Sequence, residues 1–232
     1  MRNKVLIFSA TYNEANNIIK LLNFLKKLRL KLDILIIDDN SPDFTWKIVR
    51  GYSKKNKNVK LIVRKKKEGL DTAHKIAFKY SLKKRYDFLI TLDADLSHDP
   101  KEIPNFIKHL KEHPFVIGSR YIKGGRCGMK GFRLFLSYFG NKFMQFIFNT
   151  NSTEFTSAYR GFNLKKLKGF DLRNVSSEGY SFFMETVYLI HKKGILIKEI
   201  PINFRDRKVG KSKIPKLEIF RTLYNIFKLK LI

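Results

Sequence analysis

The sequence predicts an α/β fold in which a mainly parallel sheet is covered by helices on both faces. Three observations support this prediction: short apolar runs alternate with segments of helical spacing, polar clusters follow the apolar runs, and the chain can bury one sizeable core. It has 232 residues, of which 44% are hydrophobic, and this length suits one domain better than two. Alternation of this kind is typical of strand–helix–strand units with parallel strands.

Four apolar runs have the length of strands, and they cover residues 5–10, 34–37, 59–63 and 88–92. Apolar residues at helical spacing follow the first run over residues 18–28 and the third over 73–80. Further along, the pattern predicts a helix over 100–112, a strand over 115–121 with a basic exit, and a glycine-rich loop over 124–131.

Two later segments each allow more than one structure. Residues 132–148 carry six phenylalanines, which fit either a helix buried on nearly all sides or an aromatic-rich surface resting in a membrane interface. Residues 216–232 predict an amphipathic basic helix that lies in a headgroup layer, docks to a membrane-anchoring partner, or packs back on its own domain. We therefore divide the chain into a main domain, residues 1–213, and a C-terminal helix, residues 214–232.

Composition narrows the possible partners and the compartment. The net charge of +28, from 48 Lys and Arg against 20 Asp and Glu, favours nucleic acid, an anionic membrane surface or phosphorylated substrates. No nucleic-acid-binding motif accompanies the charge, so we do not expect nucleic acid as a partner. One cysteine, Cys127, excludes an intrachain disulfide and fits a reducing cytosol. With no targeting segment and no apolar run near the roughly 20 residues that span a bilayer, we expect a cytoplasmic, non-integral protein.

Three polar clusters come where apolar runs end: residues 11–14, residues 38–42, and the pair Asp93 and Asp95. In parallel sheets, ligands bind beyond the carboxyl ends of the strands. Asp93 and Asp95 would project from the same side of an extended backbone, and Mg²⁺ or Mn²⁺ binds carboxylates together with substrate phosphates. A solvated turn, or helix capping by Glu14, Asp39, Ser41 or Asp43, is the alternative. Three acidic clusters in so basic a chain favour a shared phosphate- and cation-binding site.

Several stretches of the chain together form a recognisable pattern. They are residues 10–15, 36–43, 69–73, 92–100, 116–121, 156–160, 178–182 and 199–202, followed by Arg207 and residues 210–213. In these stretches, and in their order through most of the sequence, the chain resembles the family-2 glycosyltransferases of the GT-A fold, and among them the polyprenol-phosphate (dolichol-phosphate) mannose synthases.

This resemblance implies transfer of a hexose, usually mannose from GDP-mannose, to a polyprenyl phosphate with inversion and with Mg²⁺ or Mn²⁺. It implies donor contacts at Ala10, Tyr12, Glu14, Ile37, Asp39, Asp93, Ala94 and Asp95, with Asp93 and Asp95 holding the metal. It also implies diphosphate or acceptor-phosphate contacts at Arg120, Arg133, Arg207 and Lys213, and it makes Asp95, Arg120 and Arg133 the candidate catalytic residues. Such an enzyme is expected on the cytoplasmic face of a membrane.

The residue types suit this chemistry on physical grounds. A metal and basic side chains neutralise a diphosphate leaving group, whereas an anionic acceptor phosphate needs arginines to hold it and no general base. A saccharide hydroxyl acceptor, as in surface-polysaccharide synthesis, would need a base, with Asp95 or Glu185 as candidates. Four positions depart from the family pattern: Ala10 where proline is usual, Ser97 where some members have a glutamine ligand, Tyr138 and Ala158. The donor sugar stays open, and a nucleic-acid-binding module is a remote alternative.

Overall fold

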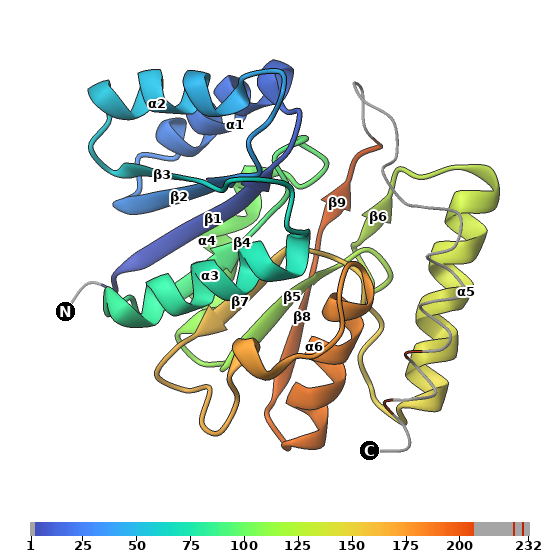
Figure 1. Ribbon diagram of the computed structural model, residues 1–232. Coiled ribbons are helices and arrows are strands. Elements are labelled where there is room, and N and C mark those ends of the chain that lie inside the picture. The colour runs from blue at the N-terminus through green and yellow to red at the C-terminus, as the bar shows by residue number, and fades with distance from the viewer. Residues whose placement is uncertain (1–2, 207–224, 226–228, 230–232) are drawn as a thin grey trace.

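The structure, a computed structural model, describes residues 3–206 together with Asn225 and Leu229. Within these residues, seven strands form one sheet in the order β3-β2-β1-β4-β7-β5-β8 (Figure 1). The strands are β1 (Val5–Thr11), β2 (Leu32–Asp38), β3 (Val59–Val63), β4 (Phe88–Thr91), β5 (Phe115–Ser119), β7 (Arg160–Asn163) and β8 (Ile197–Pro201). β7 runs antiparallel to both of its neighbours, while the other pairs are parallel. The mainly parallel sheet is therefore confirmed.

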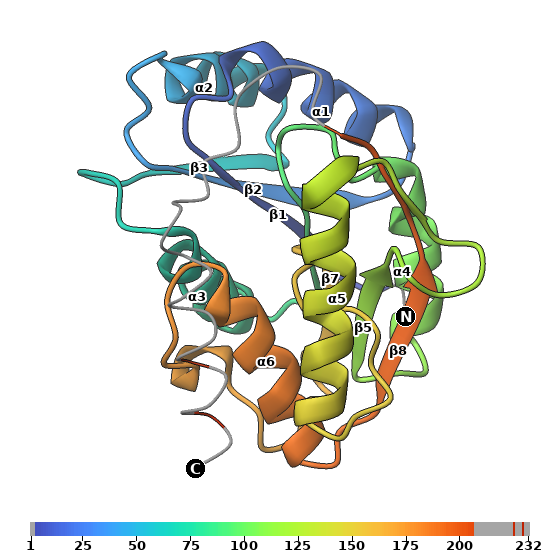
Figure 2. The same cartoon turned by 90° about the vertical axis from the view of Figure 1, so that its right-hand side faces the viewer.

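Helices cover both faces of the sheet, as predicted. One face carries α1 (Ala15–Lys27), α2 (Thr45–Lys55) and α4 (Ile103–Leu110), and the other carries α3 (Leu70–Lys83) and α6 (Ser181–Lys192), with α5 (Gly131–Ile147) beside α6 (Figures 1 and 2). Short 3-10 turns, η1 (Pro100–Glu102) and η2 (Leu172–Asn174), precede α4 and α6. Alternate side chains of β1 enter different cores: Leu6 and Phe8 pack toward α3 and α6, while Val5 and Ile7 pack toward α1.

Most expected elements of the first half occur close to their predicted bounds. β3 matches its apolar run, whereas β4 and β5 end one and two residues before the predicted strand ends. The sequence analysis made no prediction of β7, α6 or β8, in the second half. β7 has the sequence Arg160-Gly161-Phe162-Asn163, which has neither an apolar run nor an alternation that would predict a strand.

A second, two-stranded sheet pairs β6 (Arg126–Cys127) with β9 (Asn203–Phe204) in parallel. Gly128 follows β6 at a place where the backbones come close, since a Cβ there would lie 2.8 Å from the Phe204 carbonyl oxygen. Main-chain bonds join Gly128 N to Phe204 O at 2.7 Å and Arg126 N to Ile202 O at 2.9 Å. This sheet holds the segment after β8 against the glycine-rich loop.

α5 presents an aromatic face to solvent. Phe132 is 72% exposed and Phe146 is 80% exposed, whereas the helix buries only Asn141 and Met144. The helix also exposes Phe135, Leu136, Tyr138, Phe139 and Phe143. A helix buried on nearly all sides was one of two interpretations of this segment, and it is wrong. Within the described residues, none of the helices combines the length and apolar character needed to cross a bilayer.

The helix expected over residues 216–232, and the boundary between the main domain and that helix, lie outside the described residues apart from two positions. Asn225 and Leu229 are both helical. Leu229 is buried in the core between the sheet and the α3–α6 layer.

Candidate active site

The carboxyl ends of β1, β2, β4 and β5 point to the same side of the sheet. We call this row of strand ends, with the acidic residues that follow β1, β2 and β4, the acidic edge. β1 pairs in parallel with both β2 and β4, with Thr11 opposite Asp38 and Phe8 opposite Thr91. The three acidic segments that follow these strands are therefore neighbours in space, as their placement at strand ends predicts.

Asp38 joins the ends of β1 and β2. Its carboxylate is fully buried and accepts hydrogen bonds from Thr11 Oγ1 at 2.7 Å, Ser41 N at 2.8 Å and Ser41 Oγ at 2.7 Å. Ser41 Oγ in turn accepts from Asn13 N at 3.1 Å. Asp38 thus fixes the shape of the two loops and is not exposed to a ligand.

Asp43 performs the capping role that the sequence left open among several residues. Its Oδ1 accepts from Thr45 N at 3.0 Å, and its Oδ2 accepts from Ala15 N at 3.0 Å. One carboxylate therefore satisfies amide groups at the start of both α2 and α1. Glu14 precedes α1 without a side-chain cap bond, and its Oε2 accepts from Asn17 Nδ2 at 2.9 Å.

Asp39 forms a buried ion pair with Arg64, the residue directly after β3. Arg64 also donates to Gly69 O at 2.7 Å, which ties the loop before α3 to the acidic edge. Arg64 was not among the predicted site residues, although its position directly after an apolar run was a usable signal. Lys67, from the same loop, places its Nζ 4.6 Å from the centre of the Tyr12 ring.

Two of the expected donor contacts, Ile37 in β2 and Ala10 in β1, lie within strands and not in the loops that follow them. Ile37 is fully buried in the core between the sheet and the α3–α6 layer, so its side chain cannot reach a ligand in this arrangement. Ala10, the residue before the last of β1, is half-buried and packs against the same core.

Asp93 and Asp95 lie in a turn rather than on an extended strand. β4 ends at Thr91, and Leu96 has a φ of 64° in the left-handed region. The turn forms because Asp95 Oδ1 accepts from Ser97 N at 3.0 Å and from Ser97 Oγ at 2.6 Å. The expected extended geometry of the pair is therefore wrong.

The two carboxylates nevertheless suit a hard divalent cation. The Asp93 side chain is 31% exposed, Asp95 is half-buried, and Ala94 between them is buried. No group of three or more His, Cys, Asp or Glu residues that could hold a metal occurs in the part of the chain that the structure describes. A cation here would take its remaining ligands from phosphate oxygens and water, as Mg²⁺ usually does.

Arg120 follows β5 and is held by Glu154. Its Nε and Nη2 donate to Glu154 Oε2 and Oε1 at 2.7 and 2.6 Å, and Nη2 also donates to Thr156 Oγ1 at 2.7 Å. The two side chains are 6% and 0% exposed. Burial would raise the pKa of Glu154, but the Arg120 charge and hydrogen bonds outweigh it and hold that pKa below its ordinary value. The pair is therefore ionised.

Arg160, at the start of β7, supports the loop that carries Glu154. It is fully buried and donates to Ser157 O and Phe155 O, both at 2.7 Å. Burial lowers the pKa of Arg160 to about 9, although the Glu154 charge opposes this. Its guanidinium carbon also lies 4.8 Å from the centre of the Phe183 ring. Neither Glu154 nor Arg160 was predicted as a site residue, because neither follows an apolar run, although Arg160 ends one of the stretches that match the family.

The remaining expected basic residues belong to α5 or lie outside the described residues. Arg133, in the first turn of α5, is half exposed, and its Nη1 lies 3.2 Å from Asp206 Oδ1. Arg207 and Lys213 lie outside the described residues.

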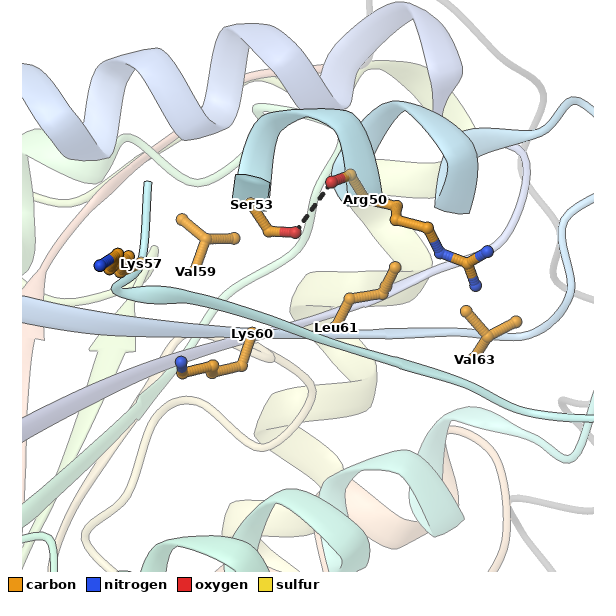
Figure 3. A pocket seen from close by; sticks show the side chains of 7 residues that line it. All are labelled: Arg50, Ser53, Lys57, Val59, Lys60, Leu61 and Val63. Carbon is orange, nitrogen blue, oxygen red and sulfur yellow. Dashed lines mark hydrogen bonds between the residues drawn. The ribbon is translucent and has the colours of Figure 1, made fainter. Parts of the chain in front are cut away.

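A groove of about 610 Å³ lies between α2 and the edge strand β3 (Figure 3). Its lining is Arg50, Ser53, Lys57, Val59, Lys60, Leu61 and Val63. None of the expected site residues belongs to this lining, so the groove is separate from the acidic edge.

Comparisons with known proteins agree with this geometry. Residues 7–170 match the family model of glycosyl transferase family 2. The chain is 31% identical to an undecaprenyl-phosphate mannosyltransferase of Micrococcus luteus over 212 residues, 91% of this chain and 87% of the relative. It is 29% identical to a polyprenol monophosphomannose synthase of Mycolicibacterium smegmatis, covering 96% and 85% of the two chains.

Solved structures show the same fold. The mannosyltransferase PcManGT from Pyrobaculum calidifontis, in complex with GDP-Man and Mn²⁺, matches with a TM-score of 0.66 at 20% identity, over 100% of this chain and 65% of that protein. Glucosyl-3-phosphoglycerate synthase from Mycobacterium tuberculosis, with Mn²⁺, UDP and phosphoglyceric acid, matches with a TM-score of 0.70 at 13% identity, over 99% and 79%. From its sheet, its acidic edge and these matches, the chain has the GT-A fold and belongs to glycosyl transferase family 2.

Proposed function

We propose that this chain transfers a mannosyl residue from GDP-mannose to the phosphate of a polyprenyl phosphate, with inversion at the anomeric carbon and with Mg²⁺ or Mn²⁺. The observation that carries the proposal is that a pair of carboxylates and a buried arginine both follow strands at the acidic edge. The chain is also 31% identical to an undecaprenyl-phosphate mannosyltransferase. The Asp93–Asp95 turn follows β4, and the buried Arg120 follows β5.

The donor half of the proposed site takes the nucleotide and the cation. Asp93 and Asp95 would hold the metal, and Tyr12, Glu14 and Asp39 would contact the nucleoside. When bound, the cation neutralises the charge that develops on the diphosphate leaving group. Ser97 supports this assignment because its two hydrogen bonds hold the Asp95 carboxylate in one orientation.

The acceptor half takes the lipid phosphate. Arg120 and Arg133 would hold the phosphate oxygens in line with the anomeric carbon, with Arg207 and Lys213 added from the family resemblance. A phosphate monoester is already anionic near neutral pH, so the attacking oxygen needs no general base.

The state of Glu185 also favours a phosphate over a hydroxyl acceptor. A hydroxyl acceptor would need a base, and Glu185 was one of two candidates. Its carboxylate is buried and accepts hydrogen bonds from Ser176 N at 2.8 Å and Ser177 N at 2.6 Å. Glu185 therefore shapes the loop before α6 and is not directed to a substrate.

We further propose that the protein works as a peripheral enzyme on the cytoplasmic face of an anionic membrane. Arg133, one of the proposed acceptor contacts, follows Phe132 at the start of the exposed aromatic face of α5. Two basic residues lie nearby in the sequence: Lys130 directly before the helix and Lys142 within it. Such a helix can place its rings among the headgroups. A membrane-anchoring partner for residues 216–232 is the alternative. If those residues bind lipid, deleting them will release the protein from anionic liposomes, whereas unchanged sedimentation would assign them to the fold or to a partner.

Transfer from radiolabelled GDP-mannose to a purified polyprenyl phosphate, with Mg²⁺ or Mn²⁺, tests the reaction. We expect label in a chloroform-soluble, acid-labile product, and no such product would refute the lipid acceptor. A binding screen of GDP- and UDP-sugars with and without Mn²⁺ identifies the nucleotide and the sugar. The second candidate, transfer to a saccharide hydroxyl, predicts that the label stays in the aqueous phase.

A further inference from the structure

His98 lies directly behind the acidic turn and has no assigned role. Its side chain is 1% exposed. The ring packs between two aromatic rings, with centroids 5.2 Å from Tyr159 and 5.6 Å from Phe204. Tyr159 comes from the segment that enters β7 and Phe204 from β9, so His98 joins the acidic turn to two distant parts of the chain.

Beyond β4, a main-chain amide of the turn bonds to the His98 ring and not to the neighbouring strand β1. Leu92 N still donates to Phe8 O of β1 at 3.1 Å. The next amide, Asp93 N, donates to His98 Nδ1 at 3.1 Å. The same Nδ1 lies 3.6 Å from Asp93 Oδ2, so the ring faces both the main chain and the carboxylate of Asp93. The bond closes a short loop from Asp93 to His98 that contains both carboxylates.

The far end of this loop is fixed to the rest of the molecule. Ser97 O accepts from Arg205 N at 3.0 Å. Asp99 O accepts from Tyr159 Oη at 3.1 Å, and Asp99 Oδ2 pairs with Arg205 Nη2 at 2.8 Å. The residues on both sides of His98 are therefore held by Arg205, directly after β9, and by the segment entering β7. His98 transmits that rigidity to the main chain of Asp93.

We propose that His98 is a positioning residue that sets the affinity of the Asp93–Asp95 pair for its divalent cation, by holding the Asp93 main chain through Nδ1. The inference rests on the metal site of the proposed function. Groups that orient metal ligands typically change metal affinity by about 10–100-fold when they are removed. His98 also lies next to Ser97, which fixes Asp95, so consecutive residues orient the two carboxylates.

Two substitutions separate the hydrogen bond from the packing. His98→Phe keeps a ring between Tyr159 and Phe204 but removes the acceptor. His98→Asn gives up the ring but places an amide oxygen near the position of Nδ1. A matched control is His113→Phe, because His113 precedes β5 at the opposite edge of the sheet.

The measurement is a titration with Mn²⁺, carried out once in the presence of GDP and once in the presence of UDP. The electron paramagnetic resonance signal of free Mn²⁺ reports how much of the metal is bound. We expect the half-saturating Mn²⁺ concentration to rise about tenfold or more in His98→Phe, and to change less than about threefold in His98→Asn and His113→Phe. Thermal unfolding in the absence of metal reports packing separately, so a purely structural role would lower the melting temperature without moving Mn²⁺ half-saturation.

An unchanged half-saturation in folded His98→Phe, or equal losses in His98→Phe and His98→Asn, would overturn the inference. If His98→Phe does not fold, His98→Gln replaces it, since its amide oxygen lies near Nε2 and cannot accept from Asp93 N; unchanged Mn²⁺ affinity there also overturns the inference. A parent protein that binds Mn²⁺ and nucleotide but forms no lipid product refutes the proposed acceptor alone. A parent protein that binds no Mn²⁺ with either nucleotide refutes the metal site and the role of His98 together.

Discussion

Two buried ion pairs lie at the acidic edge of the sheet. In one pair the acidic residue is the proposed ligand contact, and in the other it is the basic residue. In the donor half, Asp39 is the proposed ligand contact and Arg64 ties it to the loop before α3. In the acceptor half, Arg120 is the proposed ligand contact and Glu154 holds it from the protein side. A nucleoside offers hydroxyl donors, for which a carboxylate is the matching acceptor, whereas a phosphate requires a cation.

This contrast shows how so basic a protein uses its few acidic residues. Most acids at this edge orient something: Asp38 joins two loops, Asp43 caps two helices, and Glu154 fixes an arginine. Asp93 and Asp95 differ from these because they lie in a partly exposed turn at the centre of the edge. The two halves can therefore be separated by experiment, since one should fail in metal binding and the other in stability and acceptor binding.

The largest effect is expected in the donor half, from Asp95→Asn. Replacing the carboxylate by an amide removes one charged metal ligand, and we expect turnover to fall about a thousandfold because metal stabilisation amounts to several kcal/mol. The initial rate of label transfer at saturating Mn²⁺ measures it, with circular dichroism as the check of folding. Asp171→Asn, at a half-buried site that caps η2, is the matched control. Near-normal turnover of Asp95→Asn would remove it from the site.

The acceptor half should be the more sensitive in stability. Glu154→Gln leaves the buried Arg120 without its counter-charge, and we expect a loss of about 3 kcal/mol in the free energy of unfolding. Asp39→Asn should lose less, about 1 kcal/mol, because Arg64 keeps its bond to Gly69 O and lies near Glu68. Urea unfolding of both variants measures the difference. Equal losses would show that the two pairs are energetically alike.

Membrane binding should depend on α5. Replacing Phe135, Phe139 and Phe146 by serine removes exposed rings, and we expect binding to anionic liposomes to weaken at least about tenfold with little change in stability. Co-sedimentation with phosphatidylglycerol vesicles measures it. The control is Phe24→Ser with Phe44→Ser, two exposed phenylalanines on the opposite layer of the sheet. Equal binding of the α5 variant and the parent would exclude this face from membrane contact.

The smallest effect is expected from the buried His74, which belongs to neither half of the site. Burial, together with the nearby Arg160 charge, lowers the pKa of His74 from 6.5 to about 3. Because the pKa of His74 is lower in the folded protein than in the unfolded chain, protonation favours the unfolded chain. The free energy of unfolding is therefore fully retained above pH 6.5 and falls as the pH decreases toward 3. His74 packs against Phe8, Phe182 and Phe183, so His74→Phe should fit.

We expect the free energy of unfolding of the parent to fall faster than that of His74→Phe, by about 1 kcal/mol per pH unit between pH 6 and 4. Parallel pH curves of the two proteins would contradict the lowered pKa.

The sequence predicted the first half of the fold because its signals are local. Apolar runs located β1 to β4, and their polar ends carry the residues of the proposed donor half. It predicted the acceptor half less well: Arg120 was expected from a strand end, but Glu154 lies 34 residues away in a loop. Nor could the pattern distinguish Asp38, which is fully buried, from Asp39, since both follow the same apolar run.

Local patterns were enough to predict the first five strands along the chain, the acidic character of one sheet edge and the family resemblance. The tertiary structure decided the rest: the turn at Asp93 and Asp95, the exposure of α5, the partners of Arg64 and Arg120, and the place of His98 behind the turn. The physical reason is that periodicity and strand ends are properties of a few consecutive residues. A buried charge or ring, in contrast, is defined by the partners that packing brings to it from distant parts of the chain.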